Sequence, residues 1–570
     1  MTTTLHSVTD LDFTPAHRLY PSPADWRDQF IYFLLVDRFD NNAEGVPAYS
    51  AEVVGESAEV GAGHHFQGGN LKGILRRLDY LQGLGCTTIW LSPILKNRQD
   101  MSESYHGYGI QDFLEVDPRF GTLIDLQELT AAAHARGMYV ILDVVLNHTG
   151  DVWCYPDCNP YYFYQDQEYP FGSWNEVDPT EGLQDDDAVW PLELQKPDVF
   201  KRRGEIRNWH DPVEARDGDF LSLKELDLPQ PKVLDTLVKV YKYWISQADL
   251  DGFRIDTVKH MEHSATALFC NAVREYAQRI GKHNFFLFGE IVDDDRTIQK
   301  YIGRNSRMED TNERFPALDA ALDFPLYFIL EDVIKGFTSP AFLRQRYDVF
   351  RDLYADHGEA GRYFVTFVDN HDQMSRPYRR LMHNNPYPRQ AVLAISYLLT
   401  SQGVPCIYYG TEQGFDGGGP DDSFVRECMF GGNWGAFNSS GQHFFNPQHE
   451  IYAAIAVVSE LRQAQSALRY GRQYFREIST DGNAFAHPLD GHCTLAYSRI
   501  LDTEEILVAM NLEVQPHNDF VTVDYKLSSP GKFMTDLLAT ENKYRVEERN
   551  GRACVQIALP AHGMVLLKCE

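Results

Sequence analysis

The 570-residue sequence lacks several features that mark whole classes of protein. No apolar run approaches the roughly 20 residues of a membrane-spanning helix, and there are no internal repeats or low-complexity linkers. Basic residues are scarce: 52 Lys and Arg stand against 82 Asp and Glu, a net charge of −30. This charge argues against nucleic acid or an anionic membrane as a partner, because both are polyanions. The first residues lack the basic patch and apolar core of a signal peptide, so we expect a cytoplasmic protein.

Cysteine is also scarce. The sequence has nine cysteines, an odd number, and they are scattered along the chain. Cys86, Cys270 and Cys406 lie in apolar segments and are predicted to be core thiols. Only Cys154 and Cys158 are close together in the sequence. They could form a disulfide in a loop or bind a metal, but without an export signal we favour two unbonded thiols.

What the sequence contains is a repeated alternation of strand and helix patterns. A helix is predicted, for example, where Leu71, Ile74, Leu75, Leu78 and Leu81 follow at spacings of mostly three and four. Eight alternations predict an α/β fold, a (β/α)8 TIM barrel. The predicted strands are Phe30–Asp37, Thr87–Leu91, Tyr139–Val145, Gly252–Asp256, Phe285–Glu290, Ala321–Phe324, Tyr363–Val368 and Pro405–Tyr408.

Two stretches depart from this alternation. About 80 residues between His148 and a helix near Lys232 have no clear periodicity, which predicts a small domain or a functional insertion. From about Ser466, short alternating runs separated by turn residues predict an antiparallel β-sandwich.

Polar clusters stand where four of the apolar runs end. They are Asp143-Val-Val-Leu-Asn147-His148, Gly252-Phe-Arg254-Ile-Asp256, Gly289-Glu290 and Phe367-Val-Asp-Asn-His371-Asp372. In a parallel barrel the carboxyl ends of all strands lie on one face, so residues more than 200 positions apart can meet there. Three carboxylates (Asp256, Glu290 and Asp372), two His and one Arg at one rim indicate acid-catalysed cleavage of a glycosidic bond.

These segments resemble the α-amylase family of glycoside hydrolases in their order, their residues and their spacing. Three flanking segments are similar to other signatures of that family: Gly85-Cys-Thr-Thr-Ile-Trp-Leu-Ser-Pro-Ile94, Tyr105-His-Gly-Tyr108 and Gly403-Val-Pro-Cys-Ile-Tyr-Tyr-Gly-Thr-Glu412. The resemblance covers roughly residues 25–465. It implies a barrel formed by residues 1–148 and 233–465, a subdomain at 149–232 inserted after the third strand, and a C-terminal sandwich at 466–570.

The resemblance also assigns roles to the three carboxylates of a retaining mechanism. It places the nucleophile at Asp256, the general acid/base at Glu290, and a carboxylate that binds hydroxyls of the distorted sugar at Asp372. Arg254 lies two residues before Asp256 and on the same side of the strand, so we expect it to hold Asp256 ionised with a low pKa. We expect burial and the neighbouring carboxylates to raise the pKa of Glu290.

The same resemblance implies substrate contacts around the carboxylates. His148 and His371 would hydrogen-bond the sugar ring, with Tyr108 stacked beneath it. Lys259 and His260 would contact the aglycone side, although surface charge on the following helix is the alternative. Gly109 stands where the family commonly has Trp, which predicts a wider donor side.

The family often binds Ca²⁺ between the insertion and the barrel. Asn147, Glu225 and the carbonyl of His260 occupy the matching positions and would be hard oxygen ligands, as Ca²⁺ requires. In Leu223-Lys-Glu225-Leu-Asp227, however, Lys224 and Glu225 replace the usual Pro and Asp. No organic cofactor is expected.

We therefore expect a retaining hydrolase of α-1,4-glucosidic bonds in starch, glycogen or maltodextrins. The alternative is a transglycosylase, or a hydrolase of cyclodextrins or branched oligosaccharides, that uses the same residues. A non-catalytic scaffold is disfavoured, because such relatives carry a membrane helix and have usually lost catalytic carboxylates. The sequence leaves open endo or exo action, substrate length, tolerance of α-1,6 branches and the oligomeric state.

Overall fold

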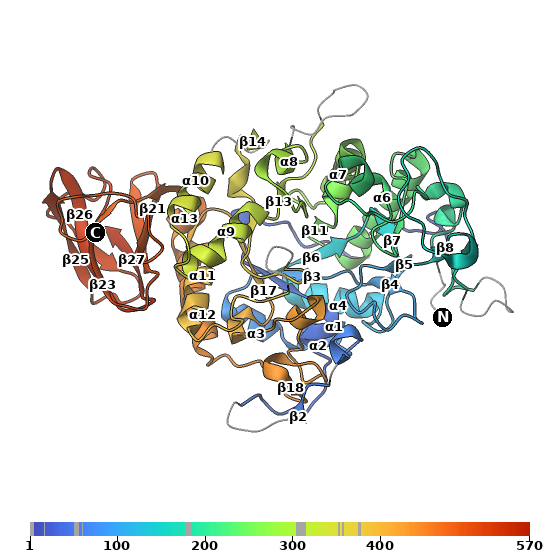
Figure 1. Ribbon diagram of the computed structural model, residues 1–570, viewed down its shortest axis with the longest axis horizontal. Helices are drawn as coiled ribbons and strands as arrows, with labels where there is room; N and C mark the ends of the chain where they lie inside the picture. Colours follow the sequence, from blue (N-terminus) through green and yellow to red (C-terminus); the bar gives the residue numbers. More distant parts are fainter. Residues whose placement is uncertain are drawn as a thin grey trace.

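The computed structural model describes residues 5–15, 17–50, 56–59, 61–176, 184–303, 315–350, 354–355, 358–373 and 378–569. Eight parallel strands form one sheet at its centre, in the order β13-β12-β11-β6-β3-β1-β17-β16 (Figure 1). A parallel bridge between Leu322 and Val365 joins the first and last strands and closes the barrel. The strands are β1 (Ile31–Leu34), β3 (Thr88–Leu91), β6 (Tyr139–Val144), β11 (Gly252–Ile255), β12 (Phe286–Gly289), β13 (Ala320–Ala321), β16 (Val365–Thr366) and β17 (Val404–Tyr408).

The predicted TIM barrel is thus confirmed, and all eight predicted strands contain or overlap an observed one. Strands of a barrel are covered on both faces, which is why they stand out in the sequence as continuous apolar runs. Two predictions extended too far. The Phe30–Asp37 run leaves the sheet at Leu34 and forms helix α1 (Val36–Phe39). Phe324 begins a helix, because the Asp323 side chain caps it by accepting a hydrogen bond from the Leu326 N–H.

Helices surround the strands (Figure 1). The cap of α4 is local: Thr122 and Asp125 satisfy each other's backbone N–H groups in a capping box. The helices are α2 (Leu71–Arg76), α3 (Leu78–Leu84), α4 (Leu123–His134), α6 (Pro231–Ala248), α7 (His263–Arg279), α8 (Asp295–Gln299), α9 (Phe324–Ile334), α10 (Ala341–Phe350), α11 (Pro388–Thr400), α12 (Glu450–Ala464) and α13 (Ser466–Tyr470). No helix in the described ranges is long and apolar enough to cross a membrane.

Five short pairs of antiparallel strands in the described part of the chain lie outside the barrel sheet. Four of them lie in its loops or in the segment after β6, and one joins distant parts of the chain. They are β4 (Leu95–Asn97) with β5 (Ile110–Val116), β7 (His148–Thr149) with β10 (Lys224–Glu225), β8 (Trp153–Cys154) with β9 (Ser173–Trp174), β14 (Tyr354–Ala355) with β15 (Gly358–Glu359), and β2 (Glu56–Ser57) with β18 (Ser439–Ser440).

The segment after β6 contains little regular structure besides β7 to β10 and helix α5 (Pro212–Asp217). Its rings pack on one another: Trp153 lies 4.8 Å from Tyr155, and Tyr155 lies 5.1 Å from Tyr161, between ring centroids. Tyr162 and Tyr164 are exposed. The aromatic residues of this insertion therefore serve mainly as its core.

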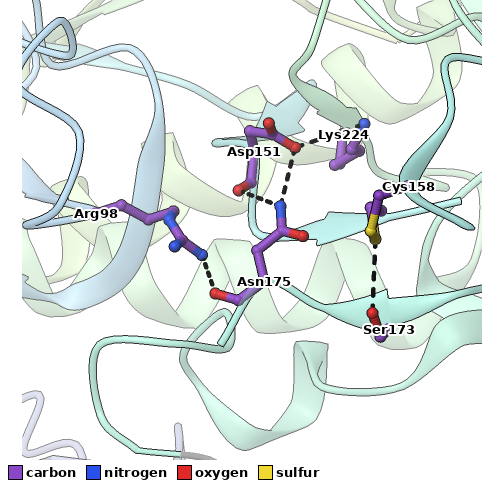
Figure 2. Close-up of a disulfide and its surroundings, with 7 residues drawn as sticks. Arg98, Asp151, Cys158, Ser173, Asn175 and Lys224 are labelled. Carbon is purple, nitrogen blue, oxygen red and sulfur yellow. Dashed lines mark hydrogen bonds and ion pairs between the residues drawn. A yellow bond between two sulfur atoms is a disulfide. The ribbon is translucent and has the colours of Figure 1, made fainter. Parts of the chain in front are cut away.

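The prediction of unbonded thiols at Cys154 and Cys158 is wrong, because the structure joins them in a disulfide (Figure 2). Their Cα atoms are 5.0 Å apart, within the range that a disulfide spans. Asp157 and Cys158 adopt positive φ, which turns the chain tightly enough to bring the two side chains together. Cys154 Sγ also lies 3.5 Å from Ser173 Oγ on the paired strand.

The C-terminal strands form a separate antiparallel body, red in Figure 1, at the opposite end of the molecule from the insertion. Its nine strands form one sheet in the order β19-β21-β22-β27-β24-β25-β26-β23-β20. Side chains from its two halves, such as Leu507 and Val555, share one core, so the sheet folds onto itself as a sandwich. The strands are β19 (Arg472–Phe475), β20 (Ile478–Ser479), β21 (Thr494–Leu501), β22 (Glu504–Asn511), β23 (His517–Thr522), β24 (Phe533–Asp536), β25 (Lys543–Arg549), β26 (Arg552–Leu559) and β27 (Met564–Cys569).

Candidate active site

One buried arginine gathers three carboxyl groups at the carboxyl ends of the barrel strands. Arg254 Nη1 lies 2.8 Å from Asp143 Oδ1 and 2.6 Å from Asp256 Oδ1. Its Nη2 lies 2.9 Å from Glu290 Oε1. The parallel register explains the first contact, since Arg254 on β11 is paired directly with Asp143 on β6. Asp256 and Glu290 follow the ends of β11 and β12.

Asp143 acts as a buried support for this arginine. Its second oxygen, Oδ2, accepts hydrogen bonds from the Tyr108 hydroxyl at 2.9 Å and from Trp90 Nε1 at 3.2 Å. The side chain is fully buried and both of its oxygens are engaged. The contact with Arg254 follows from the position of Asp143 inside β6, directly beside Arg254 on β11.

Asp256 and Glu290, two of the three carboxyl groups on Arg254, have different pKa values. Burial, with the neighbouring Asp256 and Asp372, raises the pKa of Glu290 to about 8, against the opposing charge of Arg254. Burial also raises the pKa of Asp256 to about 6, because it outweighs the lowering effect of Arg254. The upward shift at Glu290 was predicted. The low pKa expected for Asp256 was not found, although Asp256 still ionises before Glu290.

Asp372 approaches the same region from the loop after β16. Its Oδ1 lies 2.9 Å from Arg426 Nη2, and its Oδ2 lies 3.4 Å from His371 Nε2. The side chain is 32% exposed, more than those of Asp256 and Glu290, so it faces the open side of the site.

Two of the predicted ring-binding residues, Tyr108 and His371, lie beside these carboxyl groups. The Tyr108 and His371 rings are stacked, 5.3 Å apart with an interplanar angle of 12°. Burial lowers the pKa of His371, and that of His148 to about 3, so both rings are neutral. His148 lies on β7, opposite Glu225 on β10.

Lys259 and His260 lie apart from the carboxyl cluster, in the short turn after Asp256. Lys259 Nζ makes an ion pair of 2.8 Å with Asp293 Oδ2 and is 33% exposed. His260 Nδ1 lies 2.5 Å from the Ala215 carbonyl and packs against Phe220. His260 thus contacts the insertion and Lys259 the loop after β12, and the structure does not bring either against Asp256 or Glu290.

Two residues near Asp372 were missed by the sequence reasoning. Arg426 bonds Asp372, the His371 carbonyl through Nε at 3.1 Å, and the Tyr105 hydroxyl through Nη1 at 3.1 Å. No local pattern marks its role at the site, because Asp372, His371 and Tyr105 lie 54 or more residues away in the sequence. His106 is buried beside Tyr108 and could have been found, since it stands inside the quoted segment Tyr105-His-Gly-Tyr108.

A cavity of about 270 Å³ adjoins Asp372 through Arg426. Its lining is mixed, with charged and polar groups beside small residues and rings. It includes Tyr105, His106, Gly109, Gly150, Asp422 and Arg426. Gly109 lies on the wall of this cavity, and the wider donor side stays a prediction.

The residues predicted to bind calcium do not fit that ion. Asn147 Nδ2 donates a 2.6 Å hydrogen bond to Glu225 Oε2, and Lys201 Nζ lies 3.5 Å from Glu225 Oε1. A Ca²⁺ ion bound to Oε1 at about 2.4 Å would lie no more than roughly 6 Å from that ammonium group. Among the described residues, no group of three or more His, Cys, Asp and Glu is arranged to hold a metal ion.

The fold and the strand-end carboxyl groups define the class of (β/α)8-barrel proteins with an acidic site at the carboxyl ends of the strands. Residues 33–474 match the family model described as "Alpha amylase, catalytic domain", so the chain belongs to the α-amylase family.

Individual relatives agree with this family. The chain is 31% identical to an α-amylase of Streptomyces lividans over 553 residues, covering 88% of this chain and 56% of that protein. It is 27% identical to a cyclomaltodextrin glucanotransferase of Klebsiella oxytoca over 479 residues, covering 78% and 66%. The chain thus spans about half to two thirds of their length. The structure is similar to that of an α-amylase from Geobacillus thermoleovorans complexed with acarbose, with a TM-score of 0.70, 27% identity and coverage of 96% and 99%.

Proposed function

We propose that this protein hydrolyses α-1,4-glucosidic bonds in starch, glycogen or maltodextrins with retention of configuration. The observation that carries the proposal is the shared guanidinium of Arg254, which holds Asp256 and Glu290 side by side at 2.6 and 2.9 Å. A retaining glycosidase needs two close carboxyl groups, one ionised and one protonated. Between the pKa of about 6 at Asp256 and about 8 at Glu290, the pair is in that state.

The mechanism follows from these protonation states. Glu290 donates its proton to the glycosidic oxygen as the bond to C1 breaks, and the leaving sugar departs with a hydroxyl group. The Asp256 carboxylate attacks C1 and forms a covalent glycosyl ester. Glu290, now ionised, takes a proton from water, whose oxygen attacks C1 and releases Asp256. Two inversions at C1 give net retention.

Other residues would bind the sugar at the cleavage point. Asp372 projects into the open site, and its carboxylate suits a pair of sugar hydroxyl groups. The stacked Tyr108 and His371 rings provide a flat surface beside it. Lys259 and His260, in the turn after Asp256, would contact the aglycone side. His148, in the buried strand after β6, would hydrogen-bond the same ring.

An α-glucan substrate is supported by the names of the relatives. They include α-amylases, a cyclomaltodextrin glucanotransferase and a cyclomaltodextrinase, and the Geobacillus thermoleovorans structure carries acarbose. The same relatives keep a second candidate in view, a transglycosylase or a hydrolase of cyclodextrins or branched oligosaccharides. In a transglycosylase a sugar hydroxyl replaces water in the second step, and the carboxyl groups play the same parts.

The deciding experiment is a product profile. Wild type and Asp256→Asn are incubated with maltoheptaose, starch and β-cyclodextrin, and products are resolved by size and anomer. The proposal requires short maltooligosaccharides released as α-anomers by wild type alone. Longer or cyclic products would assign the protein to the transferases. Release of β-anomers, or equal turnover by Asp256→Asn, would refute the retaining mechanism.

A further inference from the structure

Lys201 places a buried positive charge where the insertion meets the barrel. Its side chain is 7% exposed. Nζ donates hydrogen bonds to the Arg216 carbonyl at 2.8 Å and to Glu262 Oε1 at 3.1 Å. It also lies 3.4 Å from Asp217 Oδ1 and 3.5 Å from Glu225 Oε1. One ammonium group thus holds three carboxylates and one carbonyl, a ligand set made entirely of oxygen.

The three carboxylates come from three separate segments. Asp217 ends α5 and Glu225 lies on β10, both in the insertion, whereas Glu262 is the N-cap residue of α7 on the barrel. The Lys201 N–H also donates to the Glu225 carbonyl at 3.1 Å. Lys201 therefore ties the insertion to the barrel loop that begins at Asp256.

The same cluster adjoins both the metal position expected from the family and the active site. Glu225 Oε2 accepts the hydrogen bond from Asn147, the first predicted calcium ligand. Glu225 is also the strand partner of His148.

Three positive charges already lie in the cluster without a metal ion. They face the carboxyl groups of Asp217, Glu225 and Glu262. Lys201 supplies one positive charge, and Arg216 and Arg203 supply two more through ion pairs to Asp217 at 2.9 and 3.9 Å. A dication would add two further positive charges beside an ammonium group that is already buried. Burying such a charge without a partner is strongly unfavourable.

We propose that the Lys201 ammonium group is the structural cation of this protein, taking the place at the junction of insertion and barrel that the family resemblance predicts for calcium. The junction is then held by a covalently attached charge and does not depend on the concentration of a free ion. The proposal concerns stability and metal content, so it stands or falls separately from the reaction that the site catalyses.

The first test uses the wild-type protein. Its melting temperature is measured after dialysis against EDTA and again with added CaCl2, and calcium is measured by elemental analysis. We expect the two melting temperatures to agree within about 1 °C, because a ligand that does not bind the folded state cannot stabilise it. Less than one calcium per ten chains is expected. Stoichiometric calcium whose removal lowers the melting temperature would overturn the proposal.

The second test compares Lys201→Met with a matched control, Lys232→Met. Lys232 also forms an ion pair, with Asp198, but its side chain is 45% exposed. We expect Lys201→Met to lose roughly 5 °C or more and the control to change little, because only the first leaves buried carboxylates without a partner. Calcium should restore part of the loss in Lys201→Met, since its carboxylates are then available to a metal ion.

A Lys201→Met protein that matches the control, or that calcium does not stabilise, contradicts the proposal. If this variant does not fold, the wild-type chelation and metal analysis decide the question.

Discussion

Arg254 is a single positive charge shared by three buried carboxyl groups, Asp143, Asp256 and Glu290. With all three ionised, this interior would carry two uncompensated negative charges. A proton retained on one of them relieves the repulsion, as in other carboxylate pairs. Glu290 has the highest of the three pKa values, so it keeps the proton.

The first prediction at this scale concerns Glu290→Gln. The amide has nearly the same shape and can still accept from Arg254, but it cannot transfer a proton. We expect the variant to fold with an unchanged melting temperature and to lose roughly 10²–10⁴-fold in kcat/KM on maltoheptaose. A maltosyl fluoride substrate, whose leaving group needs no proton, should retain a fast first step, visible as a fluoride burst.

The control for that variant is Glu115→Gln, in which the changed carboxylate is 50% exposed and pairs with Lys96 outside the site. It should retain wild-type activity. Substantial activity of Glu290→Gln on maltoheptaose would remove Glu290 from the acid/base role.

The second residue-scale prediction is the pH profile. Asp256 must be ionised, so kcat/KM should fall as pH drops through about 6. Glu290 must be protonated, so the rate should fall again as pH rises through about 8. The two groups share Arg254, and the profile reports apparent values of the pair. In Glu290→Gln the alkaline limb should disappear from the residual rate. A wild-type profile without an alkaline limb would contradict the assignment.

Much of this site could be predicted from the sequence because its parts are short and local. Arg254 lies on β11 and Asp256 directly follows it, while Asp143 lies on the neighbouring β6 and Glu290 directly follows the neighbouring β12. The pKa of Asp256 was mispredicted because the degree of burial is a property of the assembled site. Arg426 was missed for a similar reason, since only the folded loops bring it to Asp372.

At the scale of elements, the loop between β3 and β5 lines the cavity that we propose for the donor side. Gly109 stands on the wall of the cavity beside Arg426. A Cβ atom added there would lie 3.1 Å from Asn97 Oδ1 and 3.6 Å from the Gly150 Cα, close but without severe overlap. A larger side chain can therefore be carried at this position, at the expense of the open volume.

We predict that Gly109→Trp narrows the donor side. The indole would occupy part of the 270 Å³ cavity, so KM for maltoheptaose should rise by roughly tenfold, about 1.4 kcal/mol of binding. A short aryl maltoside, which needs fewer donor contacts, should be affected less, and Gly109→Ala should behave as wild type. Equal effects of Gly109→Trp on both substrates would show that the cavity does not receive sugar units.

The same contrast between local and distant order appears in the elements. Barrel strands and helices were predictable because the spacing of apolar residues within each segment indicates its secondary structure. The junction of insertion and barrel was not: the partners of Lys201 lie 16, 24 and 61 residues further along the chain. Lys224 and Glu225 in place of the usual Pro and Asp were the local signs that this junction differs from the family pattern.

At the scale of the whole molecule, the nine cysteines divide into one disulfide and seven thiols. Denatured protein without reductant should therefore titrate seven thiols, and nine after full reduction. In the native state six of the seven are buried, so reagent should reach Cys569 first. Cys154→Ser with Cys158→Ser should leave the titre at seven. Nine thiols before reduction in protein taken from an oxidising medium would contradict the bond.

The way the barrel closes has a consequence for where it can open. β13 and β16, the two strands that meet at Leu322 and Val365, are each only two residues long, so the wall is thinnest at that seam. Glu290 follows β12 on one side of the seam, and Asp372 follows β16 on the other. In the proposed complex a sugar that contacts both carboxyl groups bridges this seam, so substrate binding should also stabilise the closed barrel.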